Sequence, residues 1–164
     1  MNVKIFTTGG SIDKTYSTRH SDFIVGEPMA GNMLRDANVN LTFEIESLFA
    51  KDSLDITDDD RALIVERVSV EATRHIIITH GTDTMAQTGQ ALQHITDKVI
   101  VLTGAMQPAA FKHTDATFNL GGAIAAVQIL PAGVYLVMSG LVLKPDEAYK
   151  DMAKDQFDRR AMPR

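Results

Sequence analysis

The chain has 164 residues, 45% of them hydrophobic, which is typical of one globular domain that can bury a core of its own. Its 21 acidic and 16 basic side chains give a net charge of −5 with no cluster of lysine and arginine, so we expect no nucleic-acid partner. The absence of cysteine excludes disulfides, thiolate metal sites and cysteine nucleophiles.

Short β-rich runs alternate with longer helical patterns, as in βαβ units. In chain order we expect a strand over 3–8, a helix from 28 to before 38, a strand over 39–46, a helix from 57, a strand over 75–79, a helix over 83–97, a strand over 98–103, a helix through 120–127 and a strand over 133–138. The tail from Asp151 is expected to fray at Arg159 and Arg160. The predicted fold class is α/β: a single domain with a doubly wound, mainly parallel sheet and helices on both faces.

Ligands of open parallel sheets bind beyond the carboxyl ends of the strands, so the residues that follow each strand are the candidates for chemistry. Hydroxyls, glycines and one carboxylate stand there, in residues 7–11, 79–84 and 103–106. We therefore expect these three segments to meet at one crevice.

These residue types suit acyl transfer. Ser11 and Thr82 offer hydroxyl nucleophiles, and the N–H groups around Gly10 and Gly81 can stabilise an oxyanion. A hydroxyl needs a neighbouring base to accept its proton, and Asp83 can orient or charge-balance such a base. A desolvated lysine is one candidate for that base.

Structural interpretations of the same residues remain open. Gly9, Gly10 and Ser11 also fit a tight turn between strand and helix, and residues 82–84 fit the N-cap of the following helix. His80 by itself is more typical of a hydrogen-bonded structural histidine than of a general base. The functional interpretation depends on the coincidence of such motifs at three strand ends.

Membrane, secretion and metal chemistry find no support in the sequence. No apolar run approaches the roughly 20 residues of a transmembrane helix, and the N-terminus shows no signal-peptide pattern, so we expect a cytoplasmic protein. The five histidines do not show the helical i, i+4 spacing of a zinc hydrolase. We expect no metal and no cofactor.

Three segments resemble the signatures of the bacterial-type L-asparaginase and glutaminase family. They are TTGGSID at 7–13, ITHGTDTM at 78–85 and LTGAMQP at 102–108, and FNLGGAI and VYLVMSG follow in the family's order. The resemblance covers almost the whole chain. It implies the Rossmann- or flavodoxin-like fold of the family's N-terminal domain.

The resemblance also implies a role for each matching residue. Ser11 takes the place of the first catalytic threonine, Thr82 and Asp83 that of the second threonine and its aspartate, and Lys150, in LVLKPDEAYKDM, matches the family's lysine. The resemblance also implies that Ser53 holds the carboxylate of the substrate and that the Ala105 backbone carbonyl meets the side-chain amide. The substrate-binding positions that it implies are Gly10, Phe23, Ser53, Leu54, Gly81 and Ala105.

The sequence departs from the family pattern at three places. Serine replaces threonine at Ser11, and Phe23 stands where the family has a loop tyrosine that assists the nucleophile, although Tyr16 lies in the same loop. The third is that residues 1–164 match the N-terminal domain only, and the family's C-terminal domain, which completes a neighbouring subunit's site, is expected to be absent. We therefore expect a homo-oligomer, a dimer or tetramer.

The leading functional hypothesis is an amidohydrolase that cleaves L-asparagine or a related small amide through an acyl-enzyme. Ser11 is its nucleophile, and Thr82, Lys150 and Asp83 handle protons. The alternative is a catalytically weak module that binds aspartate or asparagine, or a subunit of a larger amidotransferase. Ser11, Phe23 and the expected absence of the C-terminal domain favour the alternative, and the joint presence of Thr82, Asp83 and Lys150 favours the enzyme.

Overall fold

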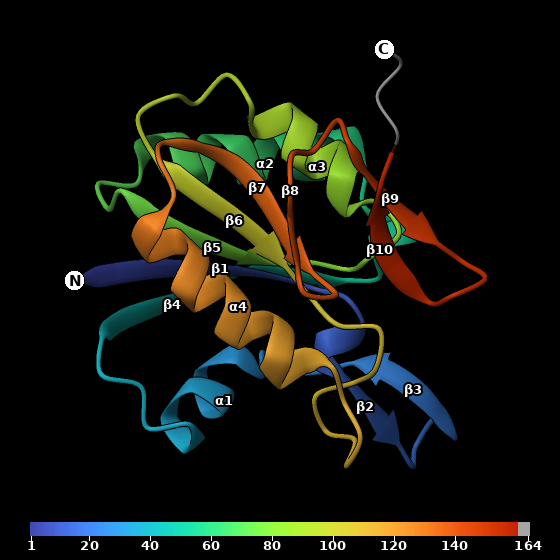
Figure 1. The fold of residues 1–164 in the computed structure, drawn as a ribbon. Coiled ribbons are helices and arrows are strands. Elements are labelled where there is room, and N and C mark those ends of the chain that lie inside the picture. Colours follow the sequence, from blue (N-terminus) through green and yellow to red (C-terminus); the bar gives the residue numbers. More distant parts are fainter. Residues whose placement is uncertain (161–164) are drawn as a thin grey trace.

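A computed structural model describes residues 1–160, and it contains one central six-stranded sheet with the strand order β4-β1-β5-β6-β7-β8 (Figure 1). All neighbouring strands run parallel except β8, which returns antiparallel beside β7. The strands are β1 (Asn2–Gly9), β4 (Thr42–Lys51), β5 (His75–Thr79), β6 (Val99–Thr103), β7 (Gly133–Met138) and β8 (Leu141–Leu143).

Helices cover both faces of this sheet, which confirms the predicted α/β class. They are α1 (Ala30–Asp36), α2 (Asp58–Val70), α3 (Met85–Leu92) and α4 (Ala116–Ile129). Alternate residues of each strand point to opposite faces, so Phe6 and Ile78 pack with α2 and α3, whereas Ile5 and Ile77 pack with α1 and α4. No helix within residues 1–160 is long and apolar enough to cross a membrane.

Two antiparallel hairpins lie outside the central sheet, and the sequence patterns did not predict either. One joins β2 (Lys14–Ser17) to β3 (Asp22–Val25), and the other joins β9 (Ala148–Asp151) to β10 (Gln156–Arg159). Figure 1 shows both hairpins at the end of the sheet where the parallel strands point. They therefore border the region in which the candidate site was expected.

Three predictions differ from the structure by more than one or two residues. The second strand runs over Thr42–Lys51 instead of 39–46, because its pairing with β1 continues past an irregularity to Gly9 and Lys51. Helix α3 ends at Leu92 instead of 97, because a turn then buries Ile95 in the core. The tail does not fray at Arg159: Phe157 is buried, Arg159 pairs with Ala148 in the β9–β10 ladder, and the Arg160 N–H donates to the Glu147 carbonyl.

Candidate functional site

The loops that follow β1, β5 and β6 touch one another through glycine backbone. A Cβ atom built on Gly10 would lie 2.4 Å from the Gly81 Cα, and one on Gly81 would lie 2.6 Å from the Ser53 Cβ. A Cβ atom on Gly104 would lie 2.3 Å from the His80 carbonyl oxygen. Only glycine fits at these three positions, so the expected crevice is built by direct contact between the loops.

Lys150 lies at the centre of the polar contacts, although 67 residues of sequence separate it from Asp83. From β9, its Nζ donates to the Thr82 Oγ1 at 2.9 Å and to the Asp83 Oδ1 at 2.8 Å. The Thr82 side chain is buried, and the Lys150 side chain is 17% exposed. A hydroxyl, an ammonium and a carboxylate are thus held in one chain of hydrogen bonds.

The contacts of Asp83 and Thr84 bear on the helix-cap interpretation. Thr84 is the N-cap residue of α3, but its side chain makes no cap hydrogen bond; it donates instead to the Ser53 carbonyl at 2.8 Å. Asp83 directs its carboxylate to Lys150. Capping of α3 therefore does not explain why these polar residues occur here.

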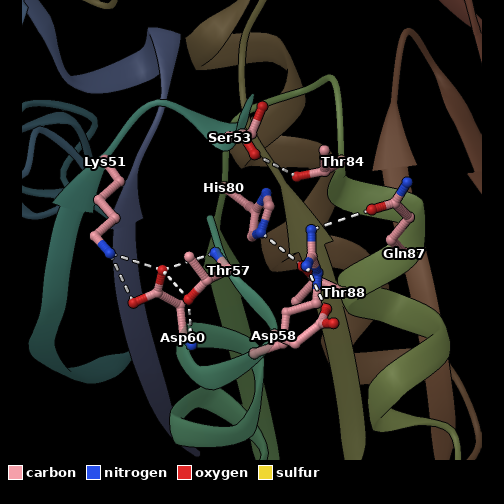
Figure 2. A network of polar contacts seen from close by, with 10 residues as sticks. Lys51, Ser53, Thr57, Asp58, Asp60, His80, Thr84, Gln87 and Thr88 are labelled. Atoms are coloured by element: carbon pink, nitrogen blue, oxygen red, sulfur yellow. Dashed lines mark hydrogen bonds and ion pairs between the residues drawn. The ribbon is translucent and has the colours of Figure 1, made fainter. Parts of the chain in front are cut away.

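Ser53 lies in the short 3₁₀ helix Ser53–Asp55, which follows β4, and it is buried against the Gly81 loop. Its Oγ accepts a hydrogen bond from the Asp83 N–H at 3.1 Å. Its backbone carbonyl accepts the hydrogen bond from the Thr84 hydroxyl, which Figure 2 shows. The next residue, Leu54, exposes 73% of its surface. Of these two predicted substrate-binding residues, Ser53 is joined to the Thr82 loop and Leu54 points to solvent.

An ion pair connects the loop of Ser53 to the β2–β3 hairpin. The Lys14 Nζ lies 2.8 Å from the Asp52 Oδ2. The hydrogen bond from Lys14 is the main cause that lowers the pKa of the Asp52 carboxyl, and the Leu54 N–H and the positive charge of Lys150 lower it further. The carboxylate beside Ser53 is therefore charged at neutral pH and fixes the hairpin to the site.

Ser11 begins the 3₁₀ helix Ser11–Asp13 directly after the left-handed Gly10 (φ 83°) and is half-buried. No hydrogen bond joins its hydroxyl to another group in the part of the chain that the structure describes. Because Gly10 touches Gly81, Ser11 and Thr82 stand on adjoining loops. The structure therefore places both candidate nucleophiles in one region, with Thr82 paired and Ser11 unpaired.

Phe23 and Tyr16, which the sequence places in one loop, are direct neighbours on paired strands of the β2–β3 hairpin. Their rings meet edge to face with centroids 5.5 Å apart, and Phe23 meets Phe111 at the same distance. All three side chains are partly exposed. The hairpin thus carries an aromatic cluster, and Phe23 contributes no hydroxyl to it.

The loop after β6 is fixed by two residues that the sequence analysis did not select. The Asp115 carboxylate accepts from the Met106 and Gln107 N–H groups, and the Asn119 side chain donates to the Gly104 carbonyl. These contacts hold Ala105, which is fully buried beside Ile12 of the Ser11 loop. Asn119 lies in the segment FNLGGAI noted in the sequence, and the i, i+4 spacing of Asp115 and Asn119 at the start of α4 is a second sequence signal for this arrangement.

His80 is a buried structural histidine, as its sequence context favours. Its Nδ1 lies 2.7 Å from the Gly81 carbonyl oxygen. Its Nε2 lies 2.8 Å from the Thr88 Oγ1, and Figure 2 shows this contact. Because the carbonyl can only accept, Nδ1 carries the proton and the Thr88 hydroxyl donates to Nε2. Burial lowers the pKa of His80 to about 4, so the ring stays neutral and orients the Gly81 loop.

Asp13 is a buried carboxyl that the sequence analysis did not select. Its Oδ1 accepts from the Met29 N–H at 2.9 Å and its carbonyl accepts from the Gly26 N–H. Asp13 thereby joins the two ends of the β2–β3 hairpin. Burial raises the pKa of the Asp13 carboxyl to about 6, and the hydrogen bond from the Met29 N–H, which lowers this pKa, offsets only part of the effect of burial.

Asp13 and His80 should make opposite contributions to the pH dependence of stability. The raised pKa of Asp13 removes stability as pH rises from about 4 to 6, and the lowered pKa of His80 removes stability as pH falls from about 6.5 to 4. Each of these two pKa shifts corresponds to a change of about 3 kcal/mol in the free energy of unfolding. We expect Asp13→Asn, which keeps the acceptor for Met29, to stabilise the protein above pH 6 and to leave a steep loss of stability below it.

Urea unfolding of both proteins at several pH values between 4 and 8 measures this difference. Asp22→Asn is the matched control, because the exposed Asp22 also accepts a bond from a backbone N–H, that of Phe23. A gain in the unfolding free energy of Asp13→Asn that did not change between pH 4 and 8 would contradict the assignment of burial as its cause.

A cleft of about 500 Å³ opens beside Lys150, between α3 and the β9–β10 hairpin. Its lining is more polar than apolar and includes Thr82, Asp83, Gln87 and Tyr149. The Lys150 ammonium therefore faces a space that admits a small polar molecule or water.

Comparison with known proteins agrees with these features. A family model described as Asparaginase, N-terminal, matches residues 2–162. L-asparaginase 2 of Escherichia coli is 30% identical over 169 residues, covering 94% of this chain and 47% of that protein. A glutamyl-tRNA(Gln) amidotransferase subunit of Pyrobaculum aerophilum is 32% identical over 132 residues, covering 77% of this chain and 29% of that protein.

A solved structure extends the likeness to the fold. The crystal structure of L-asparaginase I from Vibrio cholerae matches with a TM-score of 0.85 and 26% identity, covering 99% of this chain and 52% of that one. The chain spans about half the length of the asparaginases it matches. On the family match, the signature loops and the shared fold, this chain belongs to the asparaginase family, to whose N-terminal domain it corresponds.

Proposed function

We propose that this chain is an amidohydrolase that cleaves the side-chain amide of L-asparagine or a related small amide. The observation that carries the proposal is Lys150, whose Nζ bonds both Thr82 and Asp83 while their loop touches the loop of Ser11. A purely structural role would not require a lysine, a threonine hydroxyl and a carboxylate to meet beside a polar cleft. Membership of the asparaginase family supports the same reaction class.

The proposed reaction has two half-reactions. The Ser11 hydroxyl adds to the amide carbonyl carbon, and its proton passes through Thr82, Lys150 and Asp83 to the amide nitrogen. The C–N bond breaks, ammonia leaves, and an ester remains on Ser11. Water then adds to the ester carbonyl, the carboxylic acid leaves, and a proton returns to the Ser11 oxygen.

The neighbouring groups supply substrate contacts in this proposal. The loops meet at Gly10 and Gly81, where neighbouring backbone N–H groups would stabilise the oxyanion; the Gly10 N–H itself donates to the Lys51 carbonyl. Ser53 would bind the substrate carboxylate, and the Ala105 carbonyl would accept from its amide. Phe23 and Leu54, both exposed, would contact the substrate from the rim.

Ammonia release from purified protein tests the proposal. The panel contains L-asparagine, L-glutamine, their D forms and analogues altered at the α-amino group. We expect release from at least one side-chain amide, and saturation with substrate concentration. Absence of release from every amide, with binding of aspartate or asparagine retained in calorimetry, would instead support a binding role.

The second candidate function is a binding module or a subunit of a larger amidotransferase. The chain matches the glutamyl-tRNA(Gln) amidotransferase subunit from Pyrobaculum aerophilum. In addition, Ser11 stands where the asparaginase pattern has a threonine, and Phe23 stands where it has a tyrosine. Retention of the Lys150 contacts favours the hydrolase.

Replacing Phe23 with tyrosine should raise the rate of amide hydrolysis, because it restores a phenolic hydroxyl on the hairpin beside the Ser11 loop. One additional hydrogen bond of about 1 kcal/mol in the transition state corresponds to roughly a fivefold increase. The measurement is kcat/KM for the best amide of the panel. Phe111→Tyr is the matched control, because Phe111 packs on Phe23; an equal gain there would exclude a specific effect.

We also propose that residues 1–164 form one domain that self-associates. Several large apolar side chains are exposed among the described residues, including those of Leu54, Phe118 and Ile129. A second copy is one means of covering apolar surface that this domain exposes.

A further inference from the structure

The cleft beside Lys150 is larger than the proposed reaction requires. Its volume of about 500 Å³ lies within the range of roughly 300–1,000 Å³ that is usual for pockets enclosing drug-sized ligands. The proposed reaction uses only Thr82, Asp83 and Lys150 from its lining. The rest of the lining comes from α3 and from the chain around the β9–β10 hairpin, and it includes two glutamines, Gln87 and Gln90. These glutamines have no part in the proposed reaction.

Gln87 presents a hydrogen-bond donor to this cleft. The Arg61 Nη2 donates to the Gln87 Oε1 at 3.1 Å, and Figure 2 shows this contact at the Gln87 side chain. A guanidinium can only donate, so the contact fixes the oxygen end of the amide. Arg61 is itself held by an ion pair with Asp58 at 3.0 Å, and its side chain is only 12% exposed. Within residues 1–160 the Gln87 Nε2 has no acceptor, so it is free to donate to a ligand.

Gln90 presents the complementary acceptor. It follows Gln87 by three residues on α3, so the two side chains are neighbours on one side of the helix. The Gln90 Nε2 donates to the Pro145 carbonyl at 3.5 Å. A carbonyl can only accept, so the Gln90 Oε1 is the end that is left for a ligand. A donor from Gln87 and an acceptor from Gln90 therefore stand side by side in the lining of the cleft.

The lining favours a neutral ligand that has both a donor and an acceptor. Its charged side chains balance, with Asp83 and Asp146 against Lys150 and Arg160, so neither an anion nor a cation gains from a net charge. The N–H and C=O groups of one extended peptide residue point to the same side and bond a donor and an acceptor together. Met152, which is 72% exposed in this lining, offers an apolar contact to a peptide side chain.

We infer that Gln87 and Gln90 bind the backbone of a peptide substrate, with Gln87 donating to a carbonyl and Gln90 accepting from the N–H of the same residue. The substrate class is then an asparagine that carries a peptide on its α-nitrogen and directs its side-chain amide to Thr82 and Lys150. An acylated α-nitrogen has no charge, so it requires no carboxylate partner. The inference rests on the proposed function for its chemistry, whereas binding tests the subsite by itself.

Calorimetric affinities for two product-like ligands, alanyl-alanyl-aspartate and free aspartate, test the subsite. The peptide should bind at least about tenfold more tightly, because two hydrogen bonds are added and each is worth roughly a factor of five. Gln87→Met and Gln90→Met keep the length of the side chain and remove its amide. Each should lower the affinity for the peptide about fivefold more than the affinity for aspartate. Gln93→Met, at an exposed position that follows α3 and lies outside the cleft lining, is the matched control and should change neither affinity.

A change in the ligand tests the same contact in the unaltered protein. Lactic acid in place of the middle alanine turns the N–H that meets Gln90 into an ester oxygen. This ligand should bind the wild-type chain about fivefold more weakly than the peptide, and Gln90→Met should abolish the difference while Gln87→Met retains it. Equal affinities for peptide and aspartate, or an ester effect that persists in Gln90→Met, would overturn the inference.

Ammonia release from alanyl-alanyl-asparagine and from free asparagine separates this inference from the proposed function. We expect kcat/KM to be at least about tenfold higher for the peptide, in line with its affinity. Release from free asparagine with no preference for the peptide would overturn the subsite alone. The expected binding pattern without release from either amide would contradict the proposed hydrolysis and support a subsite for peptides.

Discussion

Ser11→Ala should lower the rate of ammonia release by several powers of ten while leaving the fold intact. In the proposed reaction the Ser11 oxygen forms the acyl-enzyme bond, and removal of a nucleophile removes the path through that intermediate. The hydroxyl has no partner among the described residues, so its loss should change the unfolding free energy by less than about 1 kcal/mol. Steady-state assays and urea unfolding measure the two quantities separately.

Ser69→Ala is the control for this experiment, because Ser69 lies on the exposed side of α2. The two candidate nucleophiles are then distinguished by Thr82→Val, which preserves shape and removes the hydroxyl that Lys150 contacts. If Ser11→Ala released ammonia at the wild-type rate, Ser11 would not be the nucleophile, and Thr82 or another group would have to take that role.

Lys150→Met should lower kcat by about 100-fold to 10,000-fold and change ligand affinity much less. Its Nζ bonds both Thr82 and Asp83, so its removal interrupts the proposed proton path, and general acid-base catalysis is typically worth that factor. An effect exerted in the transition state appears in kcat more than in the dissociation constant. The measurements are kcat and the calorimetric affinity for aspartate.

Lys154→Met provides the comparison within the same hairpin, since Lys154 carries the same charge and is largely exposed. Equal losses of affinity and kcat in Lys150→Met would identify Lys150 as an anion clamp and would contradict its role in proton transfer.

The sheet was predictable because its strands combine β-branched residues with turn signals. The predicted strands over 75–79 and 133–138 coincide with β5 and β7. Glycine next to a hydroxyl at the strand ends also predicted which loops would meet. These features are local, so they can be read from neighbouring residues.

The two hairpins were not predictable in the same way, because their strands have only four residues each and acquire order from tertiary contacts. Phe157 illustrates this: its burial in the core fixes β10, yet its surrounding sequence is polar. Asp13 and Asn119 likewise owe their importance to partners distant in the sequence.

The contact between Gly10 and Gly81 restricts how this site can diverge. Both residues already have the smallest side chain, so a substitution at one cannot be compensated by a smaller residue at the other. Adjoining positions such as Ser11 are free of this restriction. Descendants of this sequence can therefore exchange one hydroxyl for another at the strand ends, but they inherit the separation of the two loops unchanged.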